Sequence, residues 1–236
     1  STLVDLLVAG DRCHGAVLRD QAGKLSNVYA QSTLLATGGI GGLFSKTTNF
    51  AHLTGDAIAI ALKHGIRVKD LDYVQIHPTS LYTGRSGRAF LMSESLRGEG
   101  AILVGKDGQR FADELLPRDL LTKAIYTQME KDRLPYVRML LKGHVEGSIA
   151  GRFPGIHAHC LQEGYDLVED YIPIVPAQHY FMGGIAVDLN SKTSLANLYA
   201  AGETSCNGIH GKNRLASNSL LESLVFSKRA AQAIDE

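Results

Sequence analysis

Strand-like sequence lies at both ends of this chain, and a long stretch of different texture separates the two. Short runs of β-branched and aliphatic residues bounded by turn residues are typical of β-strands. The N-terminal end contains four such runs, and the first three predict a β-meander: 3–8, 15–19, 26–30 and 32–37. Strand texture returns at 185–189 and 198–201. This pattern predicts one sheet-containing domain into which a second domain is inserted.

Helical signals complete this layout. They predict helices at 54–64, at 119–131 and at 219–234, the last behind the cap candidates Asn218 and Ser219. The stretch 136–152 matches neither a helix nor a strand pattern clearly. We expect the first part of the sheet domain at 1–70, an inserted α+β domain at 71–181, and the second part of the sheet domain at 182–236.

Composition and charge argue against several classes of protein. Lys and Arg total 24 and Asp and Glu also total 24, so the net charge gives no electrostatic basis for binding nucleic acid or an anionic membrane. The longest apolar run, 57–62, is far shorter than the roughly 20 residues that a membrane span needs. Three separated cysteines (Cys13, Cys160 and Cys206) fit a reducing compartment, which we take to be the cytoplasm. We assign no metal ligands.

Glycine is over-represented, with 25 residues where a typical usage of about 7% gives roughly 16. Gly38, Gly39, Gly41 and Gly42 follow the fourth predicted strand. Their spacing lacks the third glycine of a G-x-G-x-x-G fingerprint, and no helix follows at once. A tight turn after a buried strand is therefore the simpler interpretation, and a phosphate-binding loop is the alternative.

Polar side chains gather in five short segments of otherwise apolar sequence. Each segment alone has a structural interpretation, because a single histidine is often a core residue and a charged turn is often solvated. Arg118 stands at the start of a predicted helix, where its charge opposes the helix dipole. Together the segments supply imidazole, hydroxyl and guanidinium groups, and Arg binds carboxylates in a bidentate manner. The segments are 75–79, 93–100, 117–119, 179–184 and 211–214.

In chain order these segments belong to a longer pattern. It comprises Ala36-Thr37-Gly38-Gly39, Gly55-Asp56, His77-Pro78-Thr79, Arg97-Gly98-Glu99-Gly100, Pro117-Arg118-Asp119, His179-Tyr180-Phe181-Met182-Gly183-Gly184, Ala201-Gly202-Glu203 and the run from Asn213 to Glu222. The pattern resembles the flavoprotein family of succinate dehydrogenase and fumarate reductase over nearly the whole chain. The string Arg-Leu-Ala-Ser-Asn-Ser-Leu-Leu-Glu at 214–222 is most similar to the L-aspartate oxidase branch of that family.

The resemblance implies a fold and a cofactor. The fold class is α/β plus α+β: part of a Rossmann-like FAD-binding domain of the glutathione-reductase type, with an inserted α+β capping domain. The residues that match FAD-binding positions are Thr37, Gly38, Gly39, Asp56, Glu203, Ser219 and Leu220. Within this set, the two carboxylates match groups that hold the sugar and ribityl hydroxyls. The backbone at 219–220 matches a helix N-terminus beneath the flavin ring, where N–H groups and the helix dipole stabilise negative charge.

The resemblance also implies a substrate and a reaction. His77, Ser93, His179 and Arg214 match residues that hold the two carboxylates of a dicarboxylate, with Ser93 where the family usually has Thr. Arg118 matches the arginine that transfers a proton, and Glu94 is its relay partner. Because the pKa of an arginine exceeds 12, a donor or clamp fits Arg118 better than a free base. The implied reaction is oxidation of L-aspartate to iminoaspartate, a step toward NAD, with oxygen or fumarate as the electron acceptor.

Several departures and alternatives accompany this interpretation. The family's FAD fingerprint would precede Ser1 and its helical domain would follow Glu236, so we expect an internal fragment that alone is inactive. The loop 111–117 is shorter than in the family, and Lys212 replaces a usual Ala. The alternatives are a fumarate reductase or succinate dehydrogenase flavoprotein subunit and a non-catalytic capping-domain fragment. Expected partners are the dicarboxylate substrate and, in the cell, the enzyme of the next step in NAD synthesis.

Overall fold

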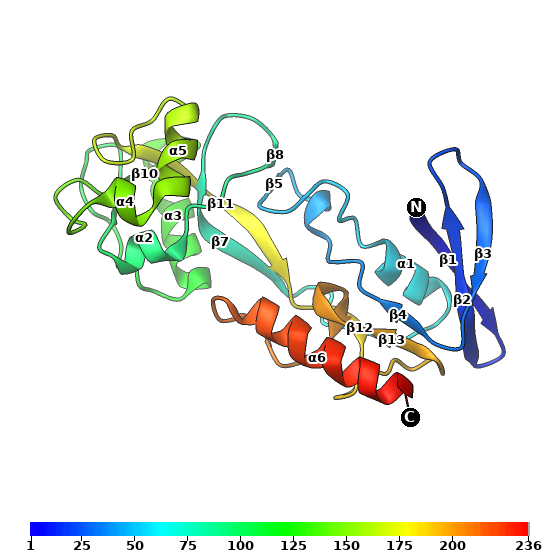
Figure 1. Ribbon diagram of the computed structural model, residues 1–236. Coiled ribbons are helices and arrows are strands. Elements are labelled where there is room, and N and C mark those ends of the chain that lie inside the picture. The colour runs from blue at the N-terminus through cyan, green and yellow to red at the C-terminus, as the bar shows by residue number, and fades with distance from the viewer. Residues whose placement is uncertain (236) are drawn as a thin grey trace. The chain divides into compact units, whose positions relative to one another are not determined.

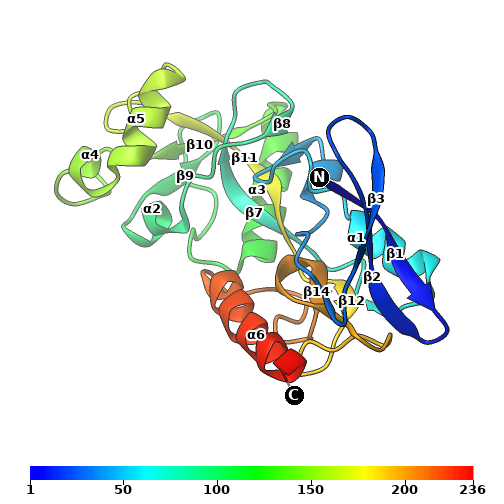
Figure 2. The same cartoon turned by 45° about the vertical axis from the view of Figure 1, so that its right-hand side comes forward.

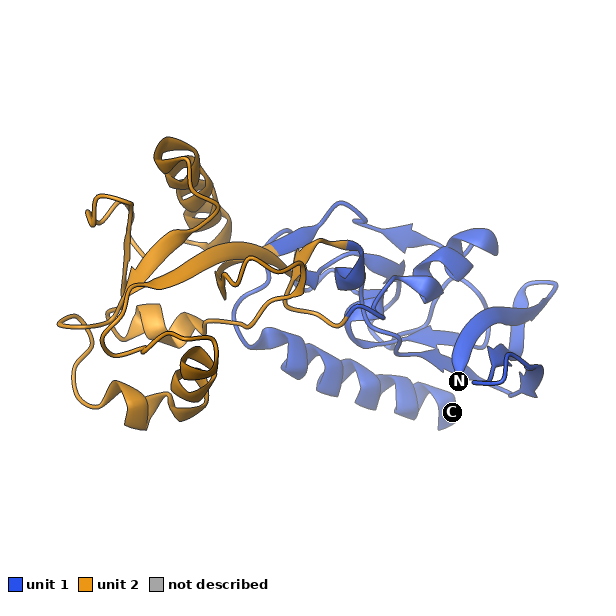
Figure 3. Ribbon diagram, turned by 90° about the horizontal axis from the view of Figure 1, so that it is seen from above, with its two compact units in different colours: residues 1–43, 51–75, 180–236 blue, residues 44–50, 76–179 orange. Residues whose placement is uncertain are grey.

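The computed structural model describes residues 1–235, which divide into two compact units (Figures 1 and 3). Unit 1 comprises residues 1–43, 51–75 and 180–236 and is blue in Figure 3, and unit 2 comprises residues 44–50 and 76–179 and is orange. Each unit has its own hydrophobic core and is described by itself.

Unit 1 begins with an antiparallel meander, which can be followed in Figure 2. Its strands are β1 (Thr2–Ala9), β2 (Arg12–Arg19) and β3 (Leu25–Tyr29). Leu6 pairs with Ala16 across the first hairpin, and Gly15 pairs with Tyr29 across the second. The side chains of Leu6 and Cys13 enter the core, whereas β3 is exposed along its whole length. The predicted meander is therefore present.

Two further small sheets complete the β-structure of unit 1. Strand β4 (Thr33–Leu35) pairs in parallel with β13 (Leu198–Ala200), so two segments of unit 1 that lie far apart in the sequence meet in one sheet. Strand β12 (Gly184–Ala186) lies between β14 (Ser205–Cys206) and β6 (Val68–Lys69). The buried residues of this core include Leu35, Ala57, Ile58, Phe181, Ile185, Leu198 and Ala200.

The helices of unit 1 follow the predicted pattern. They are α1 (Asp56–Lys63), α6 (Asn218–Asp235) and the short 3-10 turns η1 (Gly41–Leu43) and η2 (Gly202–Thr204). The backbone at Gly55 is left-handed, and its N–H donates to the carbonyl of Gly39 at 3.1 Å. This bond holds the start of α1 against the glycine-rich turn. Gly41 and Gly42 of this turn lie in η1, and β5 follows before α1 begins, so no α-helix continues directly from the turn.

Unit 2 is built on a sheet with the strand order β8-β5-β11-β10-β9, and β7 also pairs with β11. The strands are β5 (Lys46–Thr47), β7 (Val74–Leu81), β8 (Gly87–Arg88), β9 (Ile102–Val104), β10 (Val137–Leu140) and β11 (Ile172–Phe181). The helices are α2 (Glu94–Gly98), α3 (Arg118–Asp132), α4 (Ile149–Arg152) and α5 (Pro154–Gln162). Leu121 and Ile125 of α3 are fully buried with Leu103, Met139, Ile172 and Ile174 of the sheet.

The unit boundaries differ from the expected domain boundaries. The units divide after residues 75 and 179, whereas the expected domains divide after residues 70 and 181. In addition, residues 44–50 belong to unit 2, although they were expected in the first part of the sheet domain. The reason is strand pairing, because Thr47 of β5 is aligned with Gln178 of β11, and β5 also pairs with β8. The stretch 136–152, which no pattern resolved, forms β10 and α4.

Candidate functional site

An ion pair joins the first residues of two helices in unit 2. The guanidinium of Arg118, at the start of α3, donates to Oε2 of Glu94, at the start of α2, through Nε at 3.0 Å and through Nη2 at 2.7 Å. Arg118 is only 9% exposed, and a cation at a helix N-terminus is unfavourable. The carboxylate of Glu94 offsets both costs, since one of its oxygens accepts two hydrogen bonds from the guanidinium.

A second guanidinium, that of Arg97, shares this carboxylate. Arg97 lies in the last turn of α2, is 3% exposed, and places Nη2 3.9 Å from Glu94 Oε2. Its Nη1 donates to the backbone carbonyl of Glu114 at 2.5 Å, whereas Nε and Nη2 have no hydrogen-bond partner within residues 1–235. Burial lowers the pKa of Arg97, Glu94 raises it, and the charge of Arg118 lowers it again. Two cations therefore compete for one anion.

Two histidines of unit 2 stand edge to face, with ring centroids 5.1 Å apart. His77 is carried by β7 and His179 by β11. Burial lowers the pKa of His77 well below its ordinary value, and the charges of His179, Arg118 and Arg97 lower it further. His77 is therefore neutral at physiological pH. The ring of His179 places Nδ1 2.7 Å from the hydroxyl of Thr48.

Ser93 has a structural contact in this region. Its hydroxyl caps α2 by accepting a hydrogen bond from the backbone N–H of Ser95 at 3.2 Å. It also donates to the hydroxyl of Ser95 at 3.2 Å. The structure thus places Ser93 directly before Glu94 and gives its hydroxyl a helix-capping function.

Arg214 lies in unit 1, where aromatic and amide groups fix it. Its guanidinium carbon is 4.5 Å from the ring centroid of Tyr180, and both residues are buried. The side-chain amide of Gln75 donates to the carbonyl of Arg214 at 2.7 Å and to Oδ1 of Asn213 at 2.9 Å. Nη1 of Arg214 donates to the carbonyl of Leu215 at 3.0 Å. The backbone and the charged head of Arg214 are therefore both held.

The charge of Lys212, two residues before Arg214, lies against a different ring. Its Nζ is 5.2 Å from the ring centroid of Tyr73, a cation–π distance. His210, nearby, contacts the ring of Tyr180 edge to face at 5.6 Å, and burial lowers the pKa of its imidazole.

Glu203 and the glycine-rich turn meet in unit 1. Oε1 of Glu203 accepts a hydrogen bond from the backbone N–H of Phe181 at 2.9 Å. A Cβ on Gly39 would stand 2.6 Å from this oxygen, so the turn approaches Glu203 closely only because residue 39 is glycine. Burial raises the pKa of Glu203 to about 7. The hydroxyls of Thr37 and Thr204 are 3.0 Å apart, and Gly38 has a left-handed backbone between Thr37 and Gly39.

The remaining residues assigned to the flavin lie at two helix N-termini in unit 1. Asp56 is the first residue of α1, is exposed, and accepts a hydrogen bond from the hydroxyl of Thr54 at 2.8 Å. Ser219 and Leu220 lie in the first turn of α6, which contains no acidic residue and packs against η2. Backbone N–H groups in the first turn of a helix have no partner within that helix. Leu220 beside them is 67% exposed.

Comparison with known proteins now decides the family. A family model described as "FAD binding domain" matches residues 1–220. The chain belongs to the FAD binding domain family. FAD is accordingly the cofactor, as the resemblance implied, and the fold class is that of this family.

Relatives and solved structures of the FAD binding domain family agree over almost the whole chain. An L-aspartate oxidase of Clostridium perfringens is 53% identical, covering 99% of this chain and 53% of that protein, and an L-aspartate oxidase of Bacillus subtilis is 41% identical, covering 99% and 44%. A structure of an E. coli quinol fumarate reductase matches with a TM-score of 0.89 at 35% identity, covering 99% of this chain and 44% of that one. The chain spans about half the length of the relatives it matches.

The chemistry of several unit 1 residues is compatible with an FAD. The exposed Leu220 and the first-turn N–H groups of α6 combine an apolar face with a polar edge, which are the two features of a flavin ring. Asp56 and Glu203 carry carboxylate oxygens, a kind of group that accepts hydrogen bonds from hydroxyls. The close approach of Gly39 to Glu203 keeps the intervening surface free of a side chain.

Sequence reasoning missed three residues that shape these groups. Gln75 and Tyr180 hold Arg214, and Arg97 shares the carboxylate of Glu94. All three lie inside motifs that the sequence pattern already contains. The sequence feature that could have singled out Gln75 and Tyr180 is their position beside a candidate histidine. Gln75 stands two residues before His77, and Tyr180 directly follows His179.

No helix within residues 1–235 is both long enough and apolar enough to cross a membrane. The cysteines at 13, 160 and 206 are free and buried.

Proposed function

We propose that this chain supplies the substrate-binding and flavin-binding groups of an oxidase that converts L-aspartate to iminoaspartate. The observation that carries the proposal is the Glu94–Arg118 pair, because it couples a buried guanidinium to a partly exposed carboxylate that can hold a proton. The similarity to L-aspartate oxidases of several bacteria, at 41–53% identity, supports the choice of substrate.

Carboxylate binding is assigned to Arg214, His77, His179 and Ser93. Arg214 offers a planar fork whose direction Tyr180 and Gln75 fix, and such a fork matches a carboxylate in geometry and charge. Neutral His77 offers an N–H without adding charge, and His179 and Ser93 offer further polar contacts. Holding both carboxylates of the substrate fixes its reacting C–H bond, which lowers the entropic part of the barrier.

Proton removal is assigned to the Glu94–Arg118 pair. The guanidinium of Arg118 acts first as a hydrogen-bond donor to the substrate. The proton is the one that leaves the amino nitrogen of the substrate, because the Cα carries a single hydrogen; it would pass through the guanidinium to Oε2 of Glu94, the bonded partner of Arg118 at 2.7 Å. The chemistry that the flavin would supply when bound is acceptance of the Cα hydrogen as a hydride. The residues of the chain thus bind, orient and deprotonate.

Substitutions of the two arginines test this assignment in a full-length protein that carries the segment. Arg118→Leu is expected to lower kcat by at least about a hundredfold with little change in KM, because its interaction strengthens in the transition state. Arg214→Leu is expected to raise KM strongly, because its contact is already present in the bound substrate. Arg→Lys at either position should recover only part of the loss, since Lys lacks the planar fork.

The matched control is Arg152→Leu. Arg152 is another arginine of unit 2, is partly exposed, and pairs with Glu99. Its replacement should leave kcat and KM within about twofold, as surface substitutions usually do. Activity of the Arg118→Leu protein close to that of the Arg152→Leu protein would overturn the assignment.

The second candidate is a fumarate reductase flavoprotein, which the match to the E. coli quinol fumarate reductase favours. The two candidates differ in the assay, because an oxidase forms iminoaspartate and a reductase forms succinate.

We further propose that the protein acts in the cytoplasm on dicarboxylates, without a nucleic-acid or membrane partner. Its product would pass to the enzyme of the next NAD-synthesis step.

A further inference from the structure

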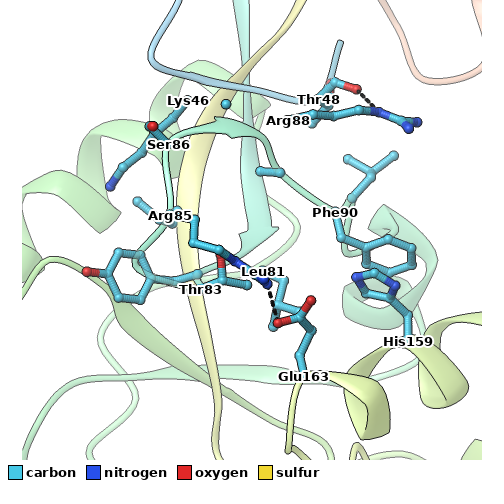
Figure 4. Close-up of a pocket in the computed structure, with 15 residues that line it drawn as sticks. Lys46, Thr48, Leu81, Thr83, Arg85, Ser86, Arg88, Phe90, His159 and Glu163 are labelled. Atoms are coloured by element: carbon cyan, nitrogen blue, oxygen red, sulfur yellow. Dashed lines mark hydrogen bonds and ion pairs between the residues drawn. The ribbon is translucent and has the colours of Figure 1, made fainter. Parts of the chain in front are cut away.

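A cavity of about 530 Å³ lies within unit 2 (Figure 4). Its walls come from β5, from the end of β7, from the loop that carries β8, and from the C-terminal part of α5. The volume falls in the range of small-molecule sites, about 300–1,000 Å³. The proposed function uses none of the charged side chains that line it.

The charged lining of this cavity is predominantly basic. Lys46, Arg85 and Arg88 line it with a single carboxylate, that of Glu163. Figure 4 shows Lys46 and Arg88 on opposite sides, with Arg85 between them. Positive charge is thus spread over several points of the cavity.

Aromatic rings and a carbonyl orient two of these cations without cancelling their charge. Nζ of Lys46 is 5.1 Å from the ring centroid of Tyr82, and the guanidinium carbon of Arg88 is 3.9 Å from that of Phe50. Nε of Arg88 also donates to the carbonyl of Thr48 at 3.3 Å. Cation–π contacts hold a side chain in place but leave its formal charge available to an anion.

The third cation, Arg85, forms an ion pair with Glu163. The side chain of Arg85 is 67% exposed, and ion pairs between exposed side chains contribute little to stability. An incoming anion can therefore take over the guanidinium from Glu163 at small cost. Packing supports this side of the cavity, because the rings of Phe90 and His159 are stacked with their centroids 3.8 Å apart.

We propose that this cavity binds a small anion with at least two negative charges, carried by phosphate or carboxylate groups. The forks of Arg85 and Arg88 match either group in bidentate geometry, and Lys46 adds a point charge on the far side. The spread of the cations selects a multivalent anion over a single-charged one. The hydroxyls of Thr83 and Ser86 in the lining add hydrogen-bond donors.

Isothermal titration calorimetry on the 236-residue chain at low ionic strength tests this proposal, with pyrophosphate and citrate as probes and acetate as the single-charged reference. Pyrophosphate or citrate should bind, and the tighter of the two identifies the phosphate or the carboxylate source. Lys46→Gln and Arg88→Gln should each weaken binding by at least about fivefold. The control Arg152→Gln removes the same charge from unit 2 outside the cavity lining and should change affinity by less than about twofold.

Glu163→Gln provides a test that misfolding does not imitate. Among residues 1–235, Glu163 alone brings a carboxylate to the cavity lining, so its replacement frees Arg85 and should tighten binding by about two- to fivefold. Two results would overturn the proposal. One is that neither probe binds at concentrations up to about 5 mM, because a specific site of this kind should have a dissociation constant below that value. The other is an equal loss of affinity in the Arg152→Gln and Arg88→Gln proteins, which would show only a general charge effect.

Discussion

Glu203 shows how one residue with a buried carboxyl can combine a fold contact with chemistry that suits the proposed flavin site. Its carboxyl lies against the glycine-rich turn at Gly39 and accepts a hydrogen bond from the backbone N–H of Phe181. Burial is the main cause that raises its pKa to about 7; the hydrogen bond from Phe181 and the charge of Arg214 act in the opposite direction, and the charge of Glu222 adds to the rise. Above this pH the folded protein holds a desolvated carboxylate that could accept more hydrogen bonds than the one it receives, from Phe181, within residues 1–235. Ligand hydroxyls are the groups that would relieve this cost.

This shift makes stability depend on pH in the absence of flavin. The folded pKa of about 7 exceeds the ordinary value of 4.5, so the folded state binds more protons between these values and stability falls as pH rises. The loss from Glu203 should begin near pH 4.5, be complete somewhat above pH 7, and total at most roughly 3 kcal/mol. Urea unfolding at pH 5 and pH 8 measures it, with Glu203→Gln as the reference. An equal pH dependence in both proteins would contradict the assignment.

Strand β11 shows where sequence patterns fail at the scale of an element. It is a ten-residue strand in the middle of the unit 2 sheet, yet Pro173 and Pro176 removed its strand signal. A proline lacks only the N–H donor. The carbonyl of Pro173 still accepts a hydrogen bond from the N–H of Tyr82 at 2.9 Å, on the side of β7. By contrast, the predicted β-meander and the helices α1, α3 and α6 are present within about two residues of their expected bounds.

The same limit applies to the site. The motifs identified Glu94, Arg118 and Arg214, because each belongs to a short contiguous string. The supporting contacts of Tyr180 and Gln75 depend on tertiary packing, and no local spacing encodes them. Whether the assigned residues bind substrate stays a prediction.

Glu114 carries a prediction for the loop between β9 and α3. The residue is 3% exposed, and its Oε1 accepts the backbone N–H of Leu103 in β9 at 2.7 Å. Its backbone carbonyl accepts a hydrogen bond from Nη1 of Arg97. Glu114→Ala should therefore lower the free energy of unfolding by about 2–3 kcal/mol, because a buried N–H loses its partner. Arg110→Gln removes only the exposed side of the Arg110–Glu114 pair and should cost less than about 1 kcal/mol. Equal losses in the two variants, measured by urea unfolding, would show that the ion pair and not the strand contact stabilises the loop.

At the scale of the whole molecule, the chain builds two separate hydrophobic cores. All buried residues of one core belong to unit 2, and all buried residues of the other belong to unit 1. The sequence predicted such a division from the change in texture near residue 70 and the return of strands at 185. It placed the boundaries several residues away, because pairing between β5 and β11 draws residues 44–50 into unit 2.

Two cores predict two unfolding transitions in calorimetry of the isolated chain. Leu121 of α3 and Ile185 of β12 are both fully buried, one in each core. Replacing either with Ala leaves a cavity that costs about 2–5 kcal/mol. Leu121→Ala should lower the midpoint of one transition and leave the other in place, and Ile185→Ala should do the reverse. Added FAD should raise only the transition that Ile185→Ala lowers, because ligands stabilise the unit they bind. A single transition that both substitutions lower equally would mean that the two cores unfold as one cooperative unit, and the separation into units would then have no thermodynamic counterpart.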